Sequence, residues 1–246
     1  MRPQSIRTVE RINRNGEPKS KIRNEAYSEN LASVRSLIGL TPSDSLLFAP
    51  CVIVTEGKTE RICLPKLIRL YLEHESRMDQ LDSFLSQVAV LDGEGDSFKQ
   101  AVRTVLSQRA SPVIFLDGDK TQLKDSLSKE FPKVPAVFLP NRQELEDLVP
   151  NHKYFESAVK RSQQVEPDGR DPSFEDFCNW RDTSENGKKM LLSKQVDYFL
   201  VRECGFTMDA KHRVLSDAID ACSNDELDFS PIKHLYEKVN AVLSMD

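Results

Sequence analysis

The chain has 246 residues, of which 39% are hydrophobic and 30% are charged, a globular composition that suits one large domain or two small ones. No apolar run approaches the ~20 residues of a membrane-spanning helix, and no apolar segment of a secretory signal follows the N-terminus, so we expect no membrane association. The formal net charge of −5 argues against a broad nucleic-acid-binding surface, although bound cations reverse the field around an acidic site.

The five cysteines are scattered, odd in number and without any Cys-x-x-Cys pair. This pattern indicates neither a zinc site nor a disulfide framework. Reduced cysteines are typical of the cytosol, and we therefore predict a cytoplasmic protein.

Residues 1–45 are interpreted as an N-terminal tail or linker. Residues 1–30 are polar and mostly basic, which favours a solvated tail, although such a stretch also suits contact with phosphates. A helix is expected from residue 28 to Gly39, followed by a turn at residues 42–44. The chain contains no Gly-x-x-x-x-Gly-Lys-[Ser/Thr] motif, so it has no P-loop of its own.

Apolar runs and helical patterns alternate from residue 50 to residue 139. Between the expected strands lie helices with apolar residues at helical spacing. The strands are expected at 50–55, 87–91, 112–116 and 134–139, and the helices at 59–75, 97–109 and 121–130. The alternation predicts an α/β domain over residues 46–140, with a parallel sheet of about four strands, flanking helices and right-handed crossovers.

After residue 141 the strand signals stop. Apolar periodicity predicts helices at 143–149, 151–163, 173–180, 187–203, 209–223 and 231–244. We interpret residues 141–246 as a helical subdomain that packs on the sheet.

Acidic residues follow two of the expected strands. Glu56 follows the first strand, and Asp117 and Asp119 follow the third. Sites of α/β proteins lie at the carboxyl ends of parallel strands, so these acids are expected to meet. Glu60 lies one helical turn after Glu56 and can face the same point. Four converging carboxylates repel one another unless a hard cation such as Mg²⁺ or Mn²⁺ neutralises them, although each acid alone is more typical of a strand or turn cap.

These motifs resemble the Toprim domain, which topoisomerases, bacterial primases and several nucleases share. The segment Val54-Thr55-Glu56-Gly57-Lys58-Thr59-Glu60 is most similar to the OLD (overcoming lysogenization defect) nucleases. The resemblance covers roughly residues 30–246 and is strongest over 48–120. It implies a metal-dependent DNA endonuclease or nickase in which acids hold two Mg²⁺ or Mn²⁺ ions ~4 Å apart. Glu56, Asp117 and Asp119 would form its acidic core.

The resemblance also assigns residues outside this core. Glu60 and Glu146 would complete the second metal position, with Glu144 as the alternative to Glu146. Lys211 would stabilise charge on the phosphate, with Lys194 or Lys58 as alternatives. Each of these residues is also an ordinary surface or helix-end residue by type. Asp92, in the acidic loop 92–96, either adds to the site or belongs to a plain turn.

The same resemblance implies partners beyond DNA. OLD proteins carry an ATPase domain ahead of the Toprim region, dimerise and are linked to phage defence. We therefore expect the chain to be the nuclease part of a larger ATPase-nuclease and to form a homodimer.

Two other functions remain open. Asp117, Asp119 and Thr121 match the Asp-x-Asp-x-Thr motif of haloacid-dehalogenase-like phosphatases, in which Asp117 would attack a phosphate monoester and Asp119 act as acid and base. That motif normally lies on the first strand, and Glu56 would then have no role. A non-catalytic Toprim interaction module is the third interpretation. A topoisomerase or primase is disfavoured, because the chain lacks a recognisable tyrosine motif and a zinc module.

Overall fold

The computed structural model describes residues 8–14, 17–23, 49–93, 97–165, 171–206 and 209–244. The chain divides into two compact units, Met1–Phe48 and Ala49–Asp246. In the described ranges, no helix combines the length and apolar character that crossing a bilayer requires.

The first unit contains a two-stranded antiparallel sheet. Strand β1 (Thr8–Arg14) pairs with β2 (Glu17–Arg23), from Thr8 opposite Arg23 to Arg14 opposite Glu17. The sequence analysis favoured a solvated tail here and did not predict these two strands. The missed signal is the Asn-Gly dipeptide between them, which favours a two-residue hairpin turn. The helix expected from residue 28 lies outside the described residues.

The second unit is built on a four-stranded parallel sheet. Its strands are β3 (Cys51–Thr55), β4 (Val88–Asp92), β5 (Ser111–Leu116) and β6 (Ala136–Phe138), in the order β4-β3-β5-β6. Every neighbouring pair is parallel. The predicted α/β class and all four strands are confirmed. The central strand β3 is buried along its whole length, which explains its uninterrupted apolar sequence.

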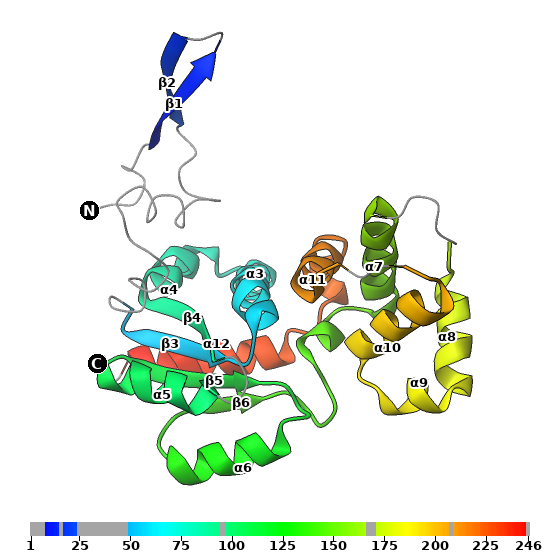
Figure 1. The fold of residues 1–246 in the computed structure, drawn as a ribbon. Helices are drawn as coiled ribbons and strands as arrows, with labels where there is room; N and C mark the ends of the chain where they lie inside the picture. Colours follow the sequence, from blue (N-terminus) through cyan, green and yellow to red (C-terminus); the bar gives the residue numbers. More distant parts are fainter. Residues whose placement is uncertain are drawn as a thin grey trace. The chain divides into compact units, whose positions relative to one another are not determined.

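Helices cover both faces of this sheet (Figure 1). Helix α3 (Lys58–His74) contacts α12 (Ser230–Leu243), and α12 contacts β3, β5 and β6. Helix α5 (Phe98–Ser107) contacts β3, β4 and β5. Side chains alternate between the faces, so Ile53 joins the main core with α3 and α12 while Val54 is buried on the other side. Helix α6 (Thr121–Glu130) connects β5 to β6.

The helical region after β6 agrees with the prediction except at two predicted helices and at the short turn η6, which was not predicted. Its helices are η4 (Leu145–Leu148), α7 (Asn151–Val165), α8 (Phe174–Thr183), α9 (Glu185–Lys189), α10 (Leu192–Tyr198), η5 (Phe199–Glu203), α11 (Lys211–Asp220) and η6 (Asn224–Glu226). The helix expected at 143–149 is a short 3-10 turn, and the one expected at 187–203 is interrupted. At the interruption, the Gln195 amide donates to the carbonyls of Gly187 and Met190, which compensates for the lost helical hydrogen bonds.

The prediction also missed a short helical segment between α3 and β4. The 3-10 turn η2 (Met78–Gln80) leads into α4 (Leu81–Gln87), which buries Phe84. This segment is short and mostly polar, so helical periodicity had little length in which to appear.

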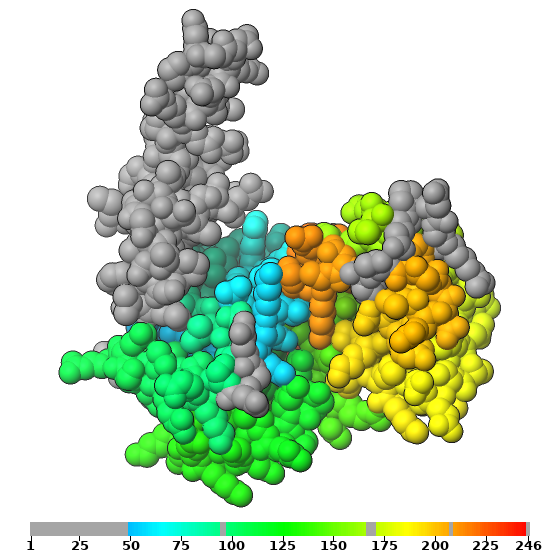
Figure 2. Space-filling view, in the orientation of Figure 1, coloured from blue at the N-terminus to red at the C-terminus, as the bar shows by residue number. Residues whose placement is uncertain are grey.

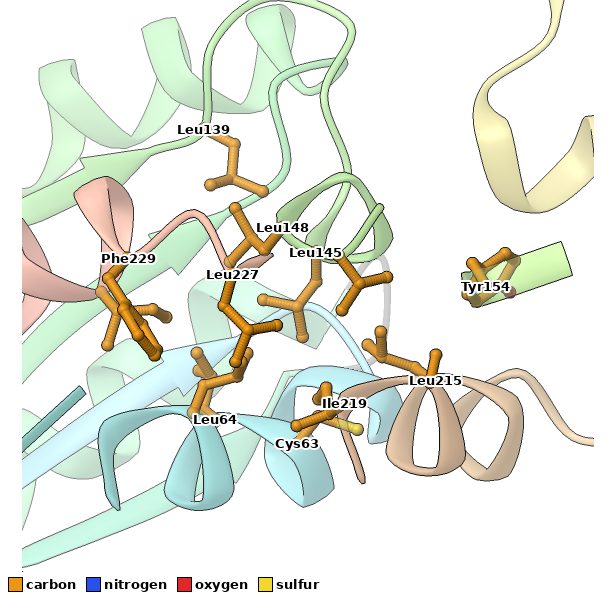
Figure 3. Close-up of a cluster of buried hydrophobic side chains, with 14 of the residues drawn as sticks. Cys63, Leu64, Leu139, Leu145, Leu148, Tyr154, Leu215, Ile219, Leu227 and Phe229 are labelled. Carbon is orange, nitrogen blue, oxygen red and sulfur yellow. The ribbon is translucent and has the colours of Figure 1, made fainter. Parts of the chain in front are cut away.

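One hydrophobic core joins the sheet helices to the later helices (Figure 3). Cys63 and Leu64 of α3 lie close to Leu215 and Ile219 of α11, beside side chains from η4 and from the segment that leads into α12. The α3 and α11 surfaces adjoin on one face of the molecule (Figure 2). The domain boundary at residue 140 remains a prediction, since both sides of it share this core. The shared core holds α11 in a set position against α3.

Gly118 lies where two segments of the chain approach each other closely. A β-carbon at this position would be 1.7 Å from the carbonyl oxygen of Pro140, and the Gly118 N–H donates to the Gln143 carbonyl over 2.8 Å. The loop after β6 therefore crosses directly over the end of β5, and only glycine leaves enough space for it.

We expect Gly118→Ala to lower the free energy of unfolding by about 3 kcal/mol or more, because backbone atoms must move to accommodate the methyl group. Urea denaturation followed by circular dichroism measures this loss. Lys129→Ala, at an exposed position of α6, is the control and should unfold at the parental urea concentration. Equal midpoints for Gly118→Ala and the parent would contradict the close approach.

Candidate metal centre

Three carboxylates meet at the carboxyl ends of β3 and β5. Glu56 follows β3, while Asp117 and Asp119 follow β5. The two strands are parallel neighbours, with Val54 opposite Ile114, so the chain leaves the sheet at the same edge after each strand. One oxygen from each carboxylate lies within 4.8 Å of the others. We call Glu56, Asp117 and Asp119 the acidic cluster.

Two more predicted acids lie beside the acidic cluster. Glu60, in the first turn of α3, is buried and accepts a 3.0 Å hydrogen bond from the Gly57 N–H. Glu146, in η4, has no exposed surface. Both act electrostatically on Asp117, but neither belongs to the group of mutually close ligand atoms. The structure thus brings five predicted acids to one region as a cluster of three with two neighbours.

Several carboxylate oxygens in this region are buried without a hydrogen-bond partner. Among the described residues, these are Glu56 Oε2, Asp117 Oδ1 and both side-chain oxygens of Glu146. A buried carboxylate oxygen without a partner is energetically costly. Oxygen-only donors in this number are what Mg²⁺ and Mn²⁺ prefer. The residues therefore fit a hard divalent cation.

Burial also changes the protonation of these acids. Burial, reinforced by the charges of Glu60 and Glu146, raises the pKa of Asp117 to about 8. Burial raises the pKa of Glu146 to about 7, even though Lys211 acts in the opposite direction. Burial raises the pKa of Glu60 as well. In the absence of a cation, Asp117 and Glu146 therefore hold protons near neutral pH, which reduces the repulsion among the acids.

Lys211 pairs with the acids of η4. Its Nζ lies 3.0 Å from Glu146 Oε2 and 3.1 Å from Glu144 Oε1. Lys211 and Glu146 form an ion pair, but the geometry of their contact does not meet the criteria for a hydrogen bond. Burial alone would lower the pKa of Lys211, but the charges of Glu146 and Glu144 outweigh burial and raise it. Lys211 thus remains cationic next to the site.

The structure separates the roles of Glu144 and Glu146. Glu144 accepts hydrogen bonds from the Ser193 N–H, the Ser193 hydroxyl and Lys211. Its oxygens are therefore occupied, while both Glu146 oxygens lack an aligned donor. Glu146 is accordingly the better placed of the two for a cation, and Glu144 positions Lys211.

The remaining candidates are found in other surroundings. Lys58 is exposed in the first turn of α3. Lys194 lines a cavity of about 370 Å³ together with Glu144, Tyr154 and Lys211. Asp92 forms an ion pair with Arg61 over 3.2 Å. Residues 94–96 of the acidic loop lie outside the described residues.

The sequence analysis missed Lys120. Its Nζ lies 2.8 Å from Glu56 Oε1 and 3.7 Å from Asp119 Oδ2. Burial would lower the pKa of Lys120, but its hydrogen bond to Glu56 and the nearby acids raise it. The available signal was its position directly after Asp119, at the start of α6.

Ion pairs hold α11, and with it Lys211, against its neighbours. Arg161 of α7 donates to both oxygens of Asp217 over 2.7 and 2.9 Å, and to Asp209 over 2.7 Å. Lys66 of α3 donates to the Ser216 carbonyl over 2.9 Å. These contacts join α3, α7 and α11 around the site.

Comparison with known proteins identifies the region that carries the cluster. Residues 47–119 match the family described as "Overcoming lysogenization defect protein-like, TOPRIM domain". This range contains Glu56, Glu60, Asp117 and Asp119. No curated protein sequence matches the chain.

The solved structures that match the chain come from two organisms. The C-terminal region of the Xanthomonas campestris pv. campestris OLD protein, phased with platinum, is 16% identical with a TM-score of 0.51, covering 82% of this chain and 97% of that one. Its mercury-phased form gives the same identity and TM-score, covering 80% and 98%. The C-terminal region of the Burkholderia pseudomallei OLD protein is 15% identical with a TM-score of 0.45, covering 79% and 99%. At such identities, the Xanthomonas structures establish a shared fold.

We expect the affinity for Mn²⁺ to rise with pH between about pH 6 and about pH 8, because bound metal must replace protons on Asp117 and Glu146. Ionisation of these buried acids also destabilises the metal-free fold as pH rises through this range. Mn²⁺ should therefore raise the melting temperature more at the higher pH. Calorimetry in buffers of different ionisation enthalpy measures the released protons.

Asp117→Asn is the matched variant for this experiment, because it removes the proton with little change in shape. It should bind Mn²⁺ more weakly and release fewer protons. An affinity that does not change with pH in the parent would contradict the raised pKa values.

Proposed function

The chain carries a Toprim domain of the OLD-like family, and we propose that this domain makes it a metal-dependent DNA endonuclease or nickase. The observation that carries the proposal is the set of buried carboxylate oxygens without a hydrogen-bond partner at Glu56 and Asp117, beside the buried Glu146, which has Lys211 as its ion-pair partner. Two of these three residues lie in the matched Toprim range, directly after adjacent parallel strands.

The acids divide into two groups that suit two cations. Glu56, Asp117 and Asp119 would hold one Mg²⁺ or Mn²⁺ ion, since their oxygens already lie within 4.8 Å of one another. Glu60 and Glu146, which both act electrostatically on Asp117, would hold a second ion. Such ions supply Lewis acidity, which makes water a better nucleophile and stabilises charge on phosphate oxygens.

Lys211 provides the fixed positive charge that a phosphodiester needs. Its ammonium group stays charged between Glu144 and Glu146, and it lines the adjacent cavity. Ser193 holds Glu144 with two donors, and Glu144 in turn orients the Lys211 amine. Lys211 would stabilise negative charge that develops on the phosphate during cleavage.

We further propose that the chain acts with other components in the cytoplasm. The similar structures are described as C-terminal regions of OLD proteins. By the resemblance to OLD proteins, an ATPase domain would precede the region, and the whole protein would act in phage defence. A homodimer would bring two such centres together.

Glu56→Gln should lower the rate of plasmid cleavage by more than about 100-fold, because the substitution removes a ligand charge at nearly constant shape. Supercoiled plasmid incubated with Mg²⁺, Mn²⁺ or EDTA shows nicking and linearisation on an agarose gel. Asp125→Asn, an exposed carboxylate change on α6, should cleave like the parent.

The same assay separates the alternative functions. Plasmid that stays supercoiled with folded, Mn²⁺-loaded parent contradicts the nuclease proposal. Metal-dependent hydrolysis of p-nitrophenyl phosphate without plasmid cleavage would support the phosphatase interpretation with Asp117 as nucleophile.

Lys211→Met should lower the cleavage rate by about 100-fold while Mn²⁺ affinity is maintained or increased, because the variant removes only a positive charge. Lys194→Met, which alters the same cavity, should retain the parental rate, since no contact with Glu144 or Glu146 is lost. Equal losses in the two variants would contradict the assignment of Lys211. Gel assays and calorimetry on the same preparations provide both measurements.

A further inference from the structure

Lys120 contacts the acidic cluster where a cation is expected. Its Nζ pairs with Glu56 Oε1 over 2.8 Å and lies 3.7 Å from Asp119 Oδ2. Glu56 and Asp119 are two of the three members of the cluster. We propose that Lys120 is a built-in competitor of the metal, which a divalent ion must displace from Glu56 and Asp119 to occupy the site. This inference rests on the proposed function, since it concerns the same metal centre.

The amine satisfies only part of the cluster. Glu56 Oε2 and Asp117 Oδ1 remain buried without a partner while Lys120 is in contact with Glu56 Oε1. A single ammonium charge on one side thus leaves the buried side of the cluster uncompensated. A divalent ion carries twice the charge and can bind oxygens of all three acids. Metal therefore replaces Lys120 once its concentration is high enough, and Lys120 sets that concentration.

Lys120 is placed so that it can leave. It lies at the N-terminal boundary of α6, and 33% of its side chain is exposed. Its ion pairs in the described part of the chain are those with Glu56 and Asp119. A lysine side chain has a flexible four-carbon stem, so the amine can move into solvent while the backbone stays in place.

Lys211, unlike Lys120, is held in place by its neighbours. Its partner Glu144 is held by Ser193, and its helix α11 is held by Arg161 and Lys66. The two lysines of the site thus differ. Lys211 is held in a rigid network, whereas the ion pairs of Lys120 within the described ranges are with prospective metal ligands.

Calorimetric titration with Mn²⁺ in the absence of DNA tests the proposal. Lys120→Gln should bind Mn²⁺ about three- to tenfold more tightly than the parent, since the competing ion pair is gone. Lys129→Gln, the same change at an exposed position of α6, should bind like the parent. Plasmid cleavage by Lys120→Gln should reach its half-maximal rate at a correspondingly lower Mn²⁺ concentration.

A second measurement needs no variant. Acetylation of the parent by an amine-reactive reagent, read by mass spectrometry, should proceed faster at Lys120 when Mn²⁺ is present, while the rate at Lys129 stays constant. Unchanged labelling of Lys120, or an Mn²⁺ affinity of Lys120→Gln no higher than that of the parent, would overturn the competitor role and leave the nuclease proposal intact. A parent that binds no Mn²⁺ at all would instead refute the metal centre on which both proposals rest.

Discussion

The concentration of carboxylates at the end of a buried sheet is the constraint on which the site depends. Like charges at short distance repel strongly where water is excluded, so the fold must compensate for them. Raised pKa values at Asp117 and Glu146 are one compensation, and the ion pairs of Lys120 and Lys211 are another. Both leave buried oxygens without partners, which is the feature that a divalent cation corrects.

Such a cluster persists only if the surrounding structure prevents the acids from moving apart. The core between α3 and α11, seen in Figure 3, supplies that restraint, since packed side chains resist displacement. Arg161 and Lys66 add polar contacts at the edge of the same interface. Gly118 contributes in another way, because it lets the loop carrying Glu144 and Glu146 pass close to the Asp117–Asp119 turn. Packing energy is thus used to hold repelling charges together.

The sequence predicts those parts of the structure that depend on local pattern. Apolar runs identified all four strands, and the acids after two of them located the cluster, because strand ends are a fixed place in an α/β fold. It does not predict which partner a long side chain selects. Two examples are the ion pair between Lys120 and Glu56 and the hydrogen bond that Glu144 accepts from Ser193. Both contacts depend on tertiary geometry across many residues. The break between α9 and α10 was missed for the same reason, since Gln195 provides its compensation through the fold.

The formal net charge of −5 also needs a different interpretation once the acids are placed. Burial raises the pKa of Asp117 and of Glu146, and Glu144 is paired with Lys211, so these acids carry less uncompensated negative charge than the count implies. Protonation or bound metal cancels much of what remains, while Lys211 and Lys120 keep their positive charge at the same place. If a divalent ion replaced the Lys120 amine beside Glu56 and Asp119, the positive charge at the acidic cluster would increase further. The count that argued against nucleic acid therefore includes charges that, under the proposed function, attract cations and through them a phosphate backbone.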